Sequence, residues 1–125
     1  TGNSCRSIIA EAQINAFIGG ASSDSSGVKA SGRVNENAKK LLIDKGIWKE
    51  EYHSKTIDQV INNDYDLVVT VCGHAQETCP VFPKAVKVVH IGFEDPDGKE
   101  FDAFIKTYDE IKEVLLPKVK EELGL

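Results

Sequence analysis

The sequence predicts an α/β protein with a parallel sheet covered by helices on both faces, a three-layer α/β/α arrangement. Residues 66–72 (DLVVTVC) and 86–93 (VKVVHIGF) are almost entirely apolar and β-branched, as strands buried on both faces of a sheet are. Segments with apolar residues at helical spacing stand before and after these two runs. Helices that alternate with buried strands are typical of a parallel sheet.

The first expected helix begins near Cys5 and stops at Gly19-Gly20. Its apolar residues recur three or four positions apart, which is the spacing of one helix face. Paired glycines end a helix, because glycine adopts the left-handed backbone that the last turn needs. After this stop, residues 21–27 alternate small residues in a pattern that predicts a strand.

The remaining elements follow the same two patterns. A helical stripe runs from Val34 to Gly46, and a short helix is expected over 56–62, ahead of the strand at 66–72. The last helix starts at Phe101, and its expected apolar face consists of Phe104, Ile105, Tyr108, Ile111, Val114, Leu115 and Val119. Pro117 should kink or interrupt it, because proline lacks the N–H that a helix interior requires.

Composition narrows the class of protein. The 125 residues carry a net charge of −5, with 41% hydrophobic and 28% charged residues, which are ordinary values for a soluble globular domain. The negative charge disfavours nucleic acid or an anionic membrane as a partner. Three cysteines, an odd number in a chain without a visible secretory signal, indicate reactive thiols in a reducing compartment, and hence a cytoplasmic protein.

The opening segment, TGNSCRS (1–7), has the composition of a loop that binds an anion. Gly2 and Asn3 tolerate tight and left-handed backbone, and Ser4 can cap the helix that follows. Successive N–H groups of such a loop form an anion site at a helix N-terminus. The planar fork of Arg6 matches two oxygens of a tetrahedral oxyanion. The alternative is an ordinary helix cap with a surface arginine.

A pair of cysteines forms the second motif. Cys72 ends a predicted strand, and a flexible GHAQET spacer separates it from Cys79, so the two thiols can meet as a disulfide or stay apart. Prolines after Cys79 indicate an exposed loop with an accessible thiol. One alternative is a zinc site built from Cys72, His74, Cys79 and His90. Another is that Cys72 is simply a small buried residue.

An acidic loop, GFEDPDGK, follows the second predicted strand. Asp95 precedes Pro96, which favours an extended conformation within a turn. A carboxylic acid at the mouth of a site can protonate a leaving oxygen, although a plain turn before the last helix would have the same sequence. Ligands of parallel sheets bind beyond the carboxyl ends of the strands, so all three motifs are expected to meet there.

Together these motifs resemble the thioredoxin-coupled arsenate reductases, which share the low-molecular-weight protein tyrosine phosphatase fold. TGNSCRS is similar to the family's phosphate-binding loop, SSG (25–27) to its serine-glycine turn, DLVVTVC to its third strand, CGHAQETCP to its redox segment and GFEDPDGKE to its acid loop. The Cys-x6-Cys pair distinguishes this chain from phosphatases of the same fold. The resemblance covers essentially the whole chain and implies one domain over 1–125, with no cofactor.

The same resemblance implies a nucleophilic cysteine immediately before Thr1. The family loop reads C-x5-R, and five residues precede Arg6 in this sequence. The first and central strand of the sheet would stand before that cysteine, so we expect this strand to be missing from the chain. Cys5 is not expected to replace the nucleophile, because it adjoins Arg6 within the loop.

The resemblance implies a thiol relay that reduces arsenate. The backbone N–H groups of Thr1, Gly2, Asn3, Ser4 and Cys5, together with the side chain of Arg6, would hold the oxyanion. The nucleophile attacks arsenic, Ser7 stabilises its thiolate and Asp95 protonates the leaving oxygen. Cys72 then attacks the nucleophile's sulfur and releases arsenite. Cys79 attacks Cys72, which moves the disulfide to the surface for thioredoxin.

Two other functions stay open at the level of sequence. A phosphatase acting on phosphotyrosine or a small phosphate ester would use the loop and Asp95 and would not need the cysteine pair. A non-catalytic oxyanion-binding protein would need the loop alone.

A cation site behind the loop is a further expectation from the resemblance. Family members often hold potassium there with an asparagine, a helix glutamate and a third, acidic residue; Asn3 and Glu11 match the first two. The third position falls in HSKT (53–56), which contains no acid. Lys55 is expected to put its ammonium in this place, with an exposed lysine as the alternative.

Overall fold

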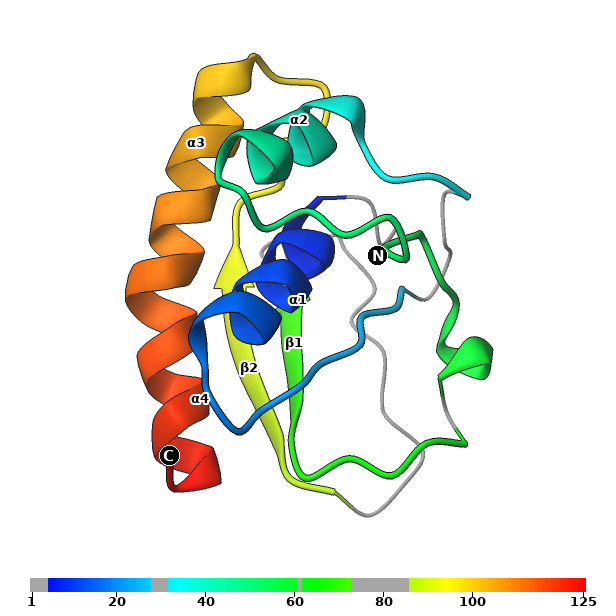
Figure 1. The fold of residues 1–125 in the computed structure, drawn as a ribbon, viewed down its shortest axis with the longest axis vertical. Helices are drawn as coiled ribbons and strands as arrows, with labels where there is room; N and C mark the ends of the chain where they lie inside the picture. Colours follow the sequence, from blue (N-terminus) through cyan, green and yellow to red (C-terminus); the bar gives the residue numbers. More distant parts are fainter. Residues whose placement is uncertain (1–4, 28–31, 61, 73–85) are drawn as a thin grey trace.

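The computed structural model describes residues 5–27, 32–60, 62–72 and 86–125. Its sheet has two parallel strands, β1 (Val68–Cys72) and β2 (Val88–Phe93). In Figure 1 helix α1 (Arg6–Phe17) lies in front of the strands, and a long helix runs along one side of them. The predicted α/β class with a parallel sheet is confirmed. In the described ranges no helix is long and apolar enough to cross a membrane.

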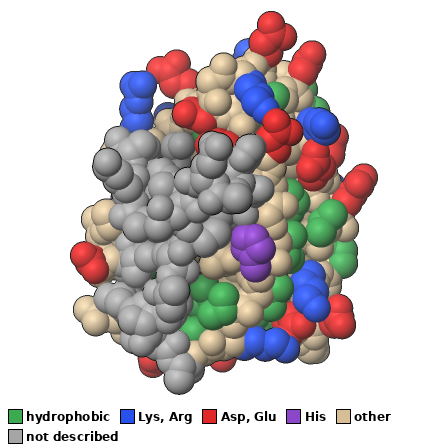
Figure 2. All heavy atoms as spheres, turned by 180° about the vertical axis from the view of Figure 1, so that it is seen from behind, with side chains coloured by type: hydrophobic (Ala, Val, Ile, Leu, Met, Phe, Trp, Pro, Cys, Tyr) green, Lys and Arg blue, Asp and Glu red, His purple; other side chains and the backbone are tan. Residues whose placement is uncertain are grey.

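The two strands pair in a register that places Thr70 opposite His90 and, after an irregularity, Cys72 opposite Phe93. Exposure alternates along β2, where Val88 and His90 are exposed and Phe93 is buried. Figure 2 shows the rear of the molecule, where a histidine and apolar side chains lie beside the undescribed surface. Helices α1, α2 (Glu36–Asp44) and α3 (Phe101–Glu110) contact one another. The described chain therefore shows the sheet and one helical layer of the predicted three-layer arrangement.

Helix α1 (Arg6–Phe17) is the central helix of this layer. Its first two turns are buried on nearly every side, and the buried residues are Arg6, Ile8, Ile9, Ala10, Glu11, Ala12 and Gln13. A helix without a polar face belongs in the interior of a protein. The helix ends before Gly19-Gly20 as predicted, and Gly20 has a φ of +85°, which suits glycine.

The strand predicted over 21–27 is not formed. This segment makes a single parallel bridge, between Gly27 and Thr56. Side chains of α1 bind it instead: the Ser23 N–H donates to Asn15 Oδ1 at 2.8 Å, and the Ser25 hydroxyl donates to Glu11 Oε1 at 2.6 Å. A groove of about 800 Å³ lies between this segment and β1.

Helix α2 (Glu36–Asp44) matches the second predicted helix. Asn35 caps its N-terminus, and the turn after it contains Gly46 with a φ of +74°. The short helix expected over 56–62 is a single 3₁₀ turn, η1 (Ile57–Gln59). Such short turns are common as connectors, because their hydrogen bonds are too poor to extend far.

The last predicted helix consists of three parts: α3 (Phe101–Glu110), a π-helical segment η2 (Ile111–Leu115) and α4 (Leu116–Leu123). Pro117 is the second residue of α4, just beyond the π segment, which confirms the predicted interruption. A π turn contains more residues than an α turn and thereby shifts the buried face. Val114, predicted in the core, is 52% exposed, whereas Leu116, which strict α spacing turns outward, is 6% exposed.

The core can be tested with two neighbouring residues of α2. Leu42 is completely buried, whereas Ile43 is 53% exposed. We expect Leu42→Ala to lower the free energy of unfolding by about 2–5 kcal/mol, because it leaves a cavity. Ile43→Ala, the matched control, should change it by about 1 kcal/mol or less. Urea denaturation measures both values, and equal losses in the two variants would contradict this packing of α2.

Candidate active site

Arg6 is the first residue of α1, and its side chain is buried at the carboxyl ends of both strands. Its Nη1 donates to the carbonyl oxygen of Phe93 at 2.9 Å and to that of Val71 at 3.4 Å. Phe93 ends β2 and Val71 is one residue from the end of β1. The guanidinium therefore lies where the topology of a parallel sheet predicts a ligand site.

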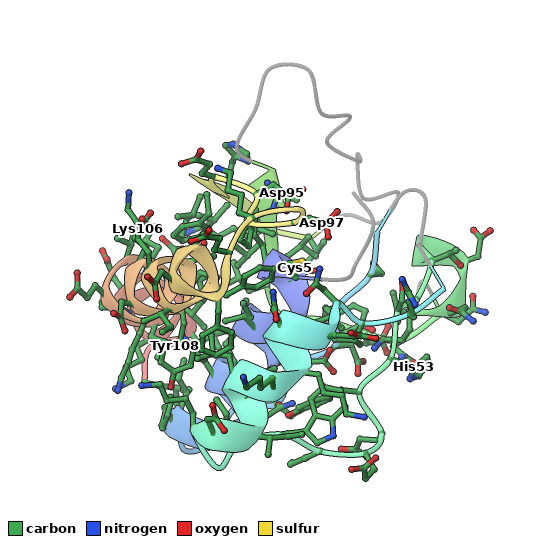
Figure 3. All side chains as sticks on the ribbon, turned by 90° about the horizontal axis from the view of Figure 1, so that it is seen from above. Cys5, His53, Asp95, Asp97, Lys106 and Tyr108 are labelled. Carbon is green, nitrogen blue, oxygen red and sulfur yellow. The ribbon has the colours of Figure 1, made fainter. Side chains whose placement is uncertain are left out.

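Asp95 lies beside this guanidinium. Its Oδ2 is 3.5 Å from Arg6 Nη2, and its side chain is 44% exposed, whereas that of Arg6 is 6% exposed. In Figure 3, which views the molecule from above, Asp95 and Asp97 lie near Cys5 at the start of α1. The structure thus brings together a buried cation and a solvent-accessible carboxyl group, two of the predicted site residues.

The loop that carries Asp95 has a defined conformation. The N–H of Asp97 donates to Asp95 Oδ1 at 3.0 Å, and the N–H of Lys99 donates to the carbonyl of Pro96 at 2.9 Å. Gly98 has a φ of +81°, which the third position of a type II turn requires. Pro96 is fully buried and anchors the turn. The acidic loop therefore holds its carboxyl group in a fixed place above the strand ends.

Other predicted residues are described in part or not at all. Cys5 is buried, with 3% exposure, and precedes α1 as its N-cap; Ser7 is half-buried in the first turn. Cys72 ends β1, but only its backbone is described. The remaining predicted site residues, Thr1, Gly2, Asn3, Ser4 and Cys79, lie outside the described residues.

Behind Arg6, a second polar group is buried against α1. Glu11 Oε1 accepts the Ser25 hydroxyl at 2.6 Å and lies 3.6 Å from Lys55 Nζ. Glu11 is 6% and Lys55 8% exposed. Lys55 Nζ also donates to the carbonyl of His53 at 3.1 Å, and the Lys55 carbonyl accepts the Gly27 N–H at 2.8 Å. The structure thus places the ammonium of Lys55 against Glu11, inside the protein.

Burial dominates the electrostatics of this group. It raises the pKa of the Glu11 carboxyl above its ordinary value of 4.5, although the Ser25 hydrogen bond and the charge of Lys55 act in the opposite direction. Desolvation disfavours the charged form of a carboxyl group, and one ion pair with one hydrogen bond offsets this only in part.

The zinc site considered as an alternative has one member with a described side chain, His90. Its Nδ1 lies 2.6 Å from Thr70 Oγ1, across the strand pair. His74 and Cys79 are outside the described residues. Among the side chains that the structure does describe, no three potential ligands gather as a metal site would require.

Two residues around the site, Ser25 and Asn35, were not assigned a role in it from the sequence. Ser25 binds Glu11, and Asn35 binds Asp97, its Nδ2 donating to Asp97 Oδ1 at 2.7 Å. Asn35 carries a recognisable signal, because asparagine before a helical stripe is a common N-cap. Its second contact joins residues far apart in the chain, which no local pattern indicates.

Comparison with known proteins shows which families and structures this chain is similar to. The family of low molecular weight phosphotyrosine protein phosphatases matches residues 1–123. An arsenate reductase of Brevibacillus brevis is 46% identical over 112 residues, covering 89% of this chain and 83% of that protein. The crystal structure of an arsenate reductase from Archaeoglobus fulgidus superposes with a TM-score of 0.81 at 35% identity, covering 98% and 94% of the two chains.

A second solved structure is that of an arsenate reductase in its phosphate-binding state. The superposition has a TM-score of 0.78 at 27% identity, and it covers 95% of this chain and 91% of the other chain.

The buried carboxyl group makes stability depend on pH. A group whose pKa is raised in the folded state stabilises the fold fully only below its unfolded pKa, near 4.5 for Glu11; this contribution is lost as the pH rises through the folded pKa. Glutamine stays neutral throughout. We therefore expect the difference in unfolding free energy between Glu11→Gln and the parent to move in favour of the variant between about pH 4 and pH 7.

Urea denaturation across this pH range measures the difference. Glu113→Gln, at an exposed position of η2, controls for the change in net charge. A difference that stays constant, or that moves toward the parent with rising pH, would contradict the prediction.

Proposed function

The chain belongs to the low molecular weight phosphotyrosine protein phosphatase family, and we propose that within this family it is an arsenate reductase. The observation that carries the proposal is the buried guanidinium of Arg6 at the strand ends, 3.5 Å from the accessible carboxyl group of Asp95. A fixed cation beside an acid is suited to a tetrahedral oxyanion that must lose one oxygen. The 46% identity to an arsenate reductase over most of both chains supports this substrate.

In the proposed reaction Arg6 binds and orients arsenate. Hydrogen bonds from Nη1 to the carbonyls of Phe93 and Val71 hold the guanidinium in place, so little side-chain entropy is lost when the anion binds. The N-terminus of α1 adds positive potential at the same place, and the family resemblance implies that backbone N–H groups of residues 1–5 also bind the oxyanion. The phosphate-binding state of a related reductase supports an oxyanion site, because phosphate has the same shape and charge as arsenate.

The chemical steps need a thiolate nucleophile, which the family resemblance puts immediately before Thr1. Its sulfur bonds to arsenic(V) while one oxygen leaves as water, with the last proton supplied by Asp95. The thiolate of Cys72 then attacks that sulfur. A disulfide forms, the sulfur–arsenic bond breaks, and its electron pair stays on arsenic, which leaves as arsenite. Two electrons have passed from two thiols to one arsenic atom.

Regeneration uses the second cysteine of the pair. The thiolate of Cys79 attacks Cys72, which releases the nucleophile and leaves a Cys72–Cys79 disulfide. A dithiol reductant of the thioredoxin class then reduces this disulfide, consistent with a protein of the reducing cytoplasm. The cysteine pair is the feature that favours reduction over phosphate ester hydrolysis, the runner-up function, which needs only the loop, Arg6 and Asp95.

We also propose that Lys55 serves as the internal cation of the site. Its ammonium lies 3.6 Å from Glu11 and is buried with it, in the place where the resemblance expects potassium. Glu11 is about one and a half turns from Arg6 on the same helix, so the pair supports the N-terminal turn of α1. Asn3, the other residue expected in this group, lies outside the described residues.

The relay can be tested by removing each thiol in the full-length protein. We expect Cys72→Ser to release no arsenite. Cys79→Ser should release about one arsenite per molecule and then stop, because the first disulfide cannot move to the surface. Cys5→Ala keeps the backbone N–H and should turn over. The measurement is arsenite formation with thioredoxin, its reductase and NADPH.

Sustained turnover by either relay variant would exclude the three-thiol reductase. If both variants also hydrolysed a phosphate ester at the rate of the parent, the phosphatase would become the better assignment.

The internal cation has a separate test. We expect Lys55→Ala to lower the free energy of unfolding at neutral pH by about 3–5 kcal/mol, because Glu11 is left buried without a counter-charge. Replacing sodium with potassium in the buffer should restore part of this loss and should not affect the parent. Lys49→Ala, at an exposed position, is the control. An equal potassium effect on parent and variant would count against Lys55 as the resident cation.

A further inference from the structure

We propose that Asn35 is a positioning residue for Asp95, which it holds through the side chain of Asp97. The inference rests on the proposed function, in which Asp95 is the proton donor. Asn35 stands 60 positions from Asp95 in the sequence, and neither residue type nor spacing connects them. The structure joins them through two hydrogen bonds, from Asn35 to Asp97 and from Asp97 to Asp95.

The first part of the connection is a fixed asparagine. Asn35 Oδ1 accepts hydrogen bonds from the N–H groups of Asn37 at 2.8 Å and Ala38 at 3.4 Å, so it caps α2. These two bonds define which end of the amide is the oxygen and direct Nδ2 away from the helix. The helix itself is anchored by Ala38, Leu41 and Leu42, which are buried in the core. Asn35 Nδ2 is therefore a hydrogen-bond donor whose position is fixed by a helix that packs into the core.

The second part is Asp97, which is bound at both its side chain and its backbone. Its Oδ1 accepts from Asn35 Nδ2 at 2.7 Å, and its N–H donates to Asp95 Oδ1 at 3.0 Å. The other oxygen of Asp95 faces Arg6 Nη2 at 3.5 Å. Figure 3 shows Asp95 and Asp97 side by side above the start of α1. Movement of Asp97 would therefore move the carboxyl group that faces the guanidinium.

The loop needs such an anchor because burial does not hold this carboxyl group. Asp95 is 44% exposed, and Asp97, Gly98 and Lys99 are all exposed. Pro96 fixes the base of the turn inside the protein, but the exposed residues beyond it need a contact of their own. The ion pair of Lys99 with Glu94 joins two exposed residues of the same loop, so it does not tie the loop to the core. The hydrogen bond from Asn35 to Asp97 connects the loop to the core through helix α2.

Placement of an acid affects the rate of proton transfer more than the binding of the oxyanion. Arg6 and the loop backbone would bind arsenate with or without a well-placed Asp95. A donor that is displaced by an ångström can cost up to about 100-fold in rate. Loss of the Asn35 contact is therefore expected to lower kcat and to leave KM for arsenate nearly unchanged.

The experiment exchanges donor and acceptor between the two positions. Asn35→Asp keeps the shape and the helix cap, since aspartate caps as well as asparagine, but it places two carboxylates against each other. Asp97→Asn alone keeps an oxygen that accepts from Asn35 Nδ2. The double variant N35D/D97N reverses the hydrogen bond, with the amide now at position 97, and has the net charge of the parent.

Steady-state reduction of arsenate by the full-length protein, with thioredoxin, its reductase and NADPH, is the first readout. We expect Asn35→Asp to be slower by about tenfold with KM within about twofold, and with a thermal unfolding midpoint close to that of the parent. Asp97→Asn and the double variant should react at about the rate of the parent. A purely structural role for Asn35 would not predict recovery of the rate by the second substitution.

Protection of the Asp97 amide against hydrogen exchange, measured by NMR, is the second readout and does not depend on chemistry. It should fall in Asn35→Asp and return in the double variant. Unchanged kcat in Asn35→Asp, or a double variant as slow as Asn35→Asp, would overturn the inference. A parent that reduces no arsenate would overturn the proposed function instead, and unchanged amide protection in Asn35→Asp would then overturn the anchor itself.

Discussion

The guanidinium of Arg6 is a full positive charge inside the protein, and it is stable there only if several acceptors face it at once. The carbonyl oxygens of Val71 and Phe93 are two of them, and Asp95 is the third group. This requirement constrains the surrounding structure. Both strands must end at the same level, the start of α1 must lie over these ends, and the loop after β2 must turn back toward the helix. The site geometry follows from satisfying one buried charge.

The same requirement applies to the other polar residues of α1. Glu11 binds Ser25 and Lys55, and the Nε2 group of Gln13 donates to the carbonyl oxygen of Tyr108 at 3.0 Å. Each contact joins α1 to a different part of the chain. The Oε1 atom of Gln13 is the buried side-chain atom that lacks a partner among the described residues. Because its polar residues are used this way, α1 has no solvent-facing stripe and its orientation is set by hydrogen bonds as much as by packing.

The spacing of apolar residues was sufficient to predict the helices and strands in which that spacing is constant along the whole element. The strands at 66–72 and 86–93 and the helix from Val34 were predicted because their apolar residues follow one period throughout. Residues 21–27 were predicted wrongly, since their small side chains also suit an extended segment bound by Asn15 and Glu11 side chains. The exposure of Val114 depends on the change of helix type at η2, which hydrophobic spacing alone does not reveal.

In the candidate site, too, residues with a local sequence signal were predictable and residues with only long-range contacts were not. Arg6 and Asp95 were identifiable because they stand next to a glycine-containing loop and a proline, which have strong local signals. Asn35 and Ser25 act through residues distant in the sequence, so only the folded chain shows what they contact.

The π segment at 111–115 has a consequence for the length of this helix. A π turn is an α turn with one residue inserted, so this helix can gain or lose a residue there and change type rather than misalign its buried side chains. Relatives that differ in length within this helix can therefore share one core.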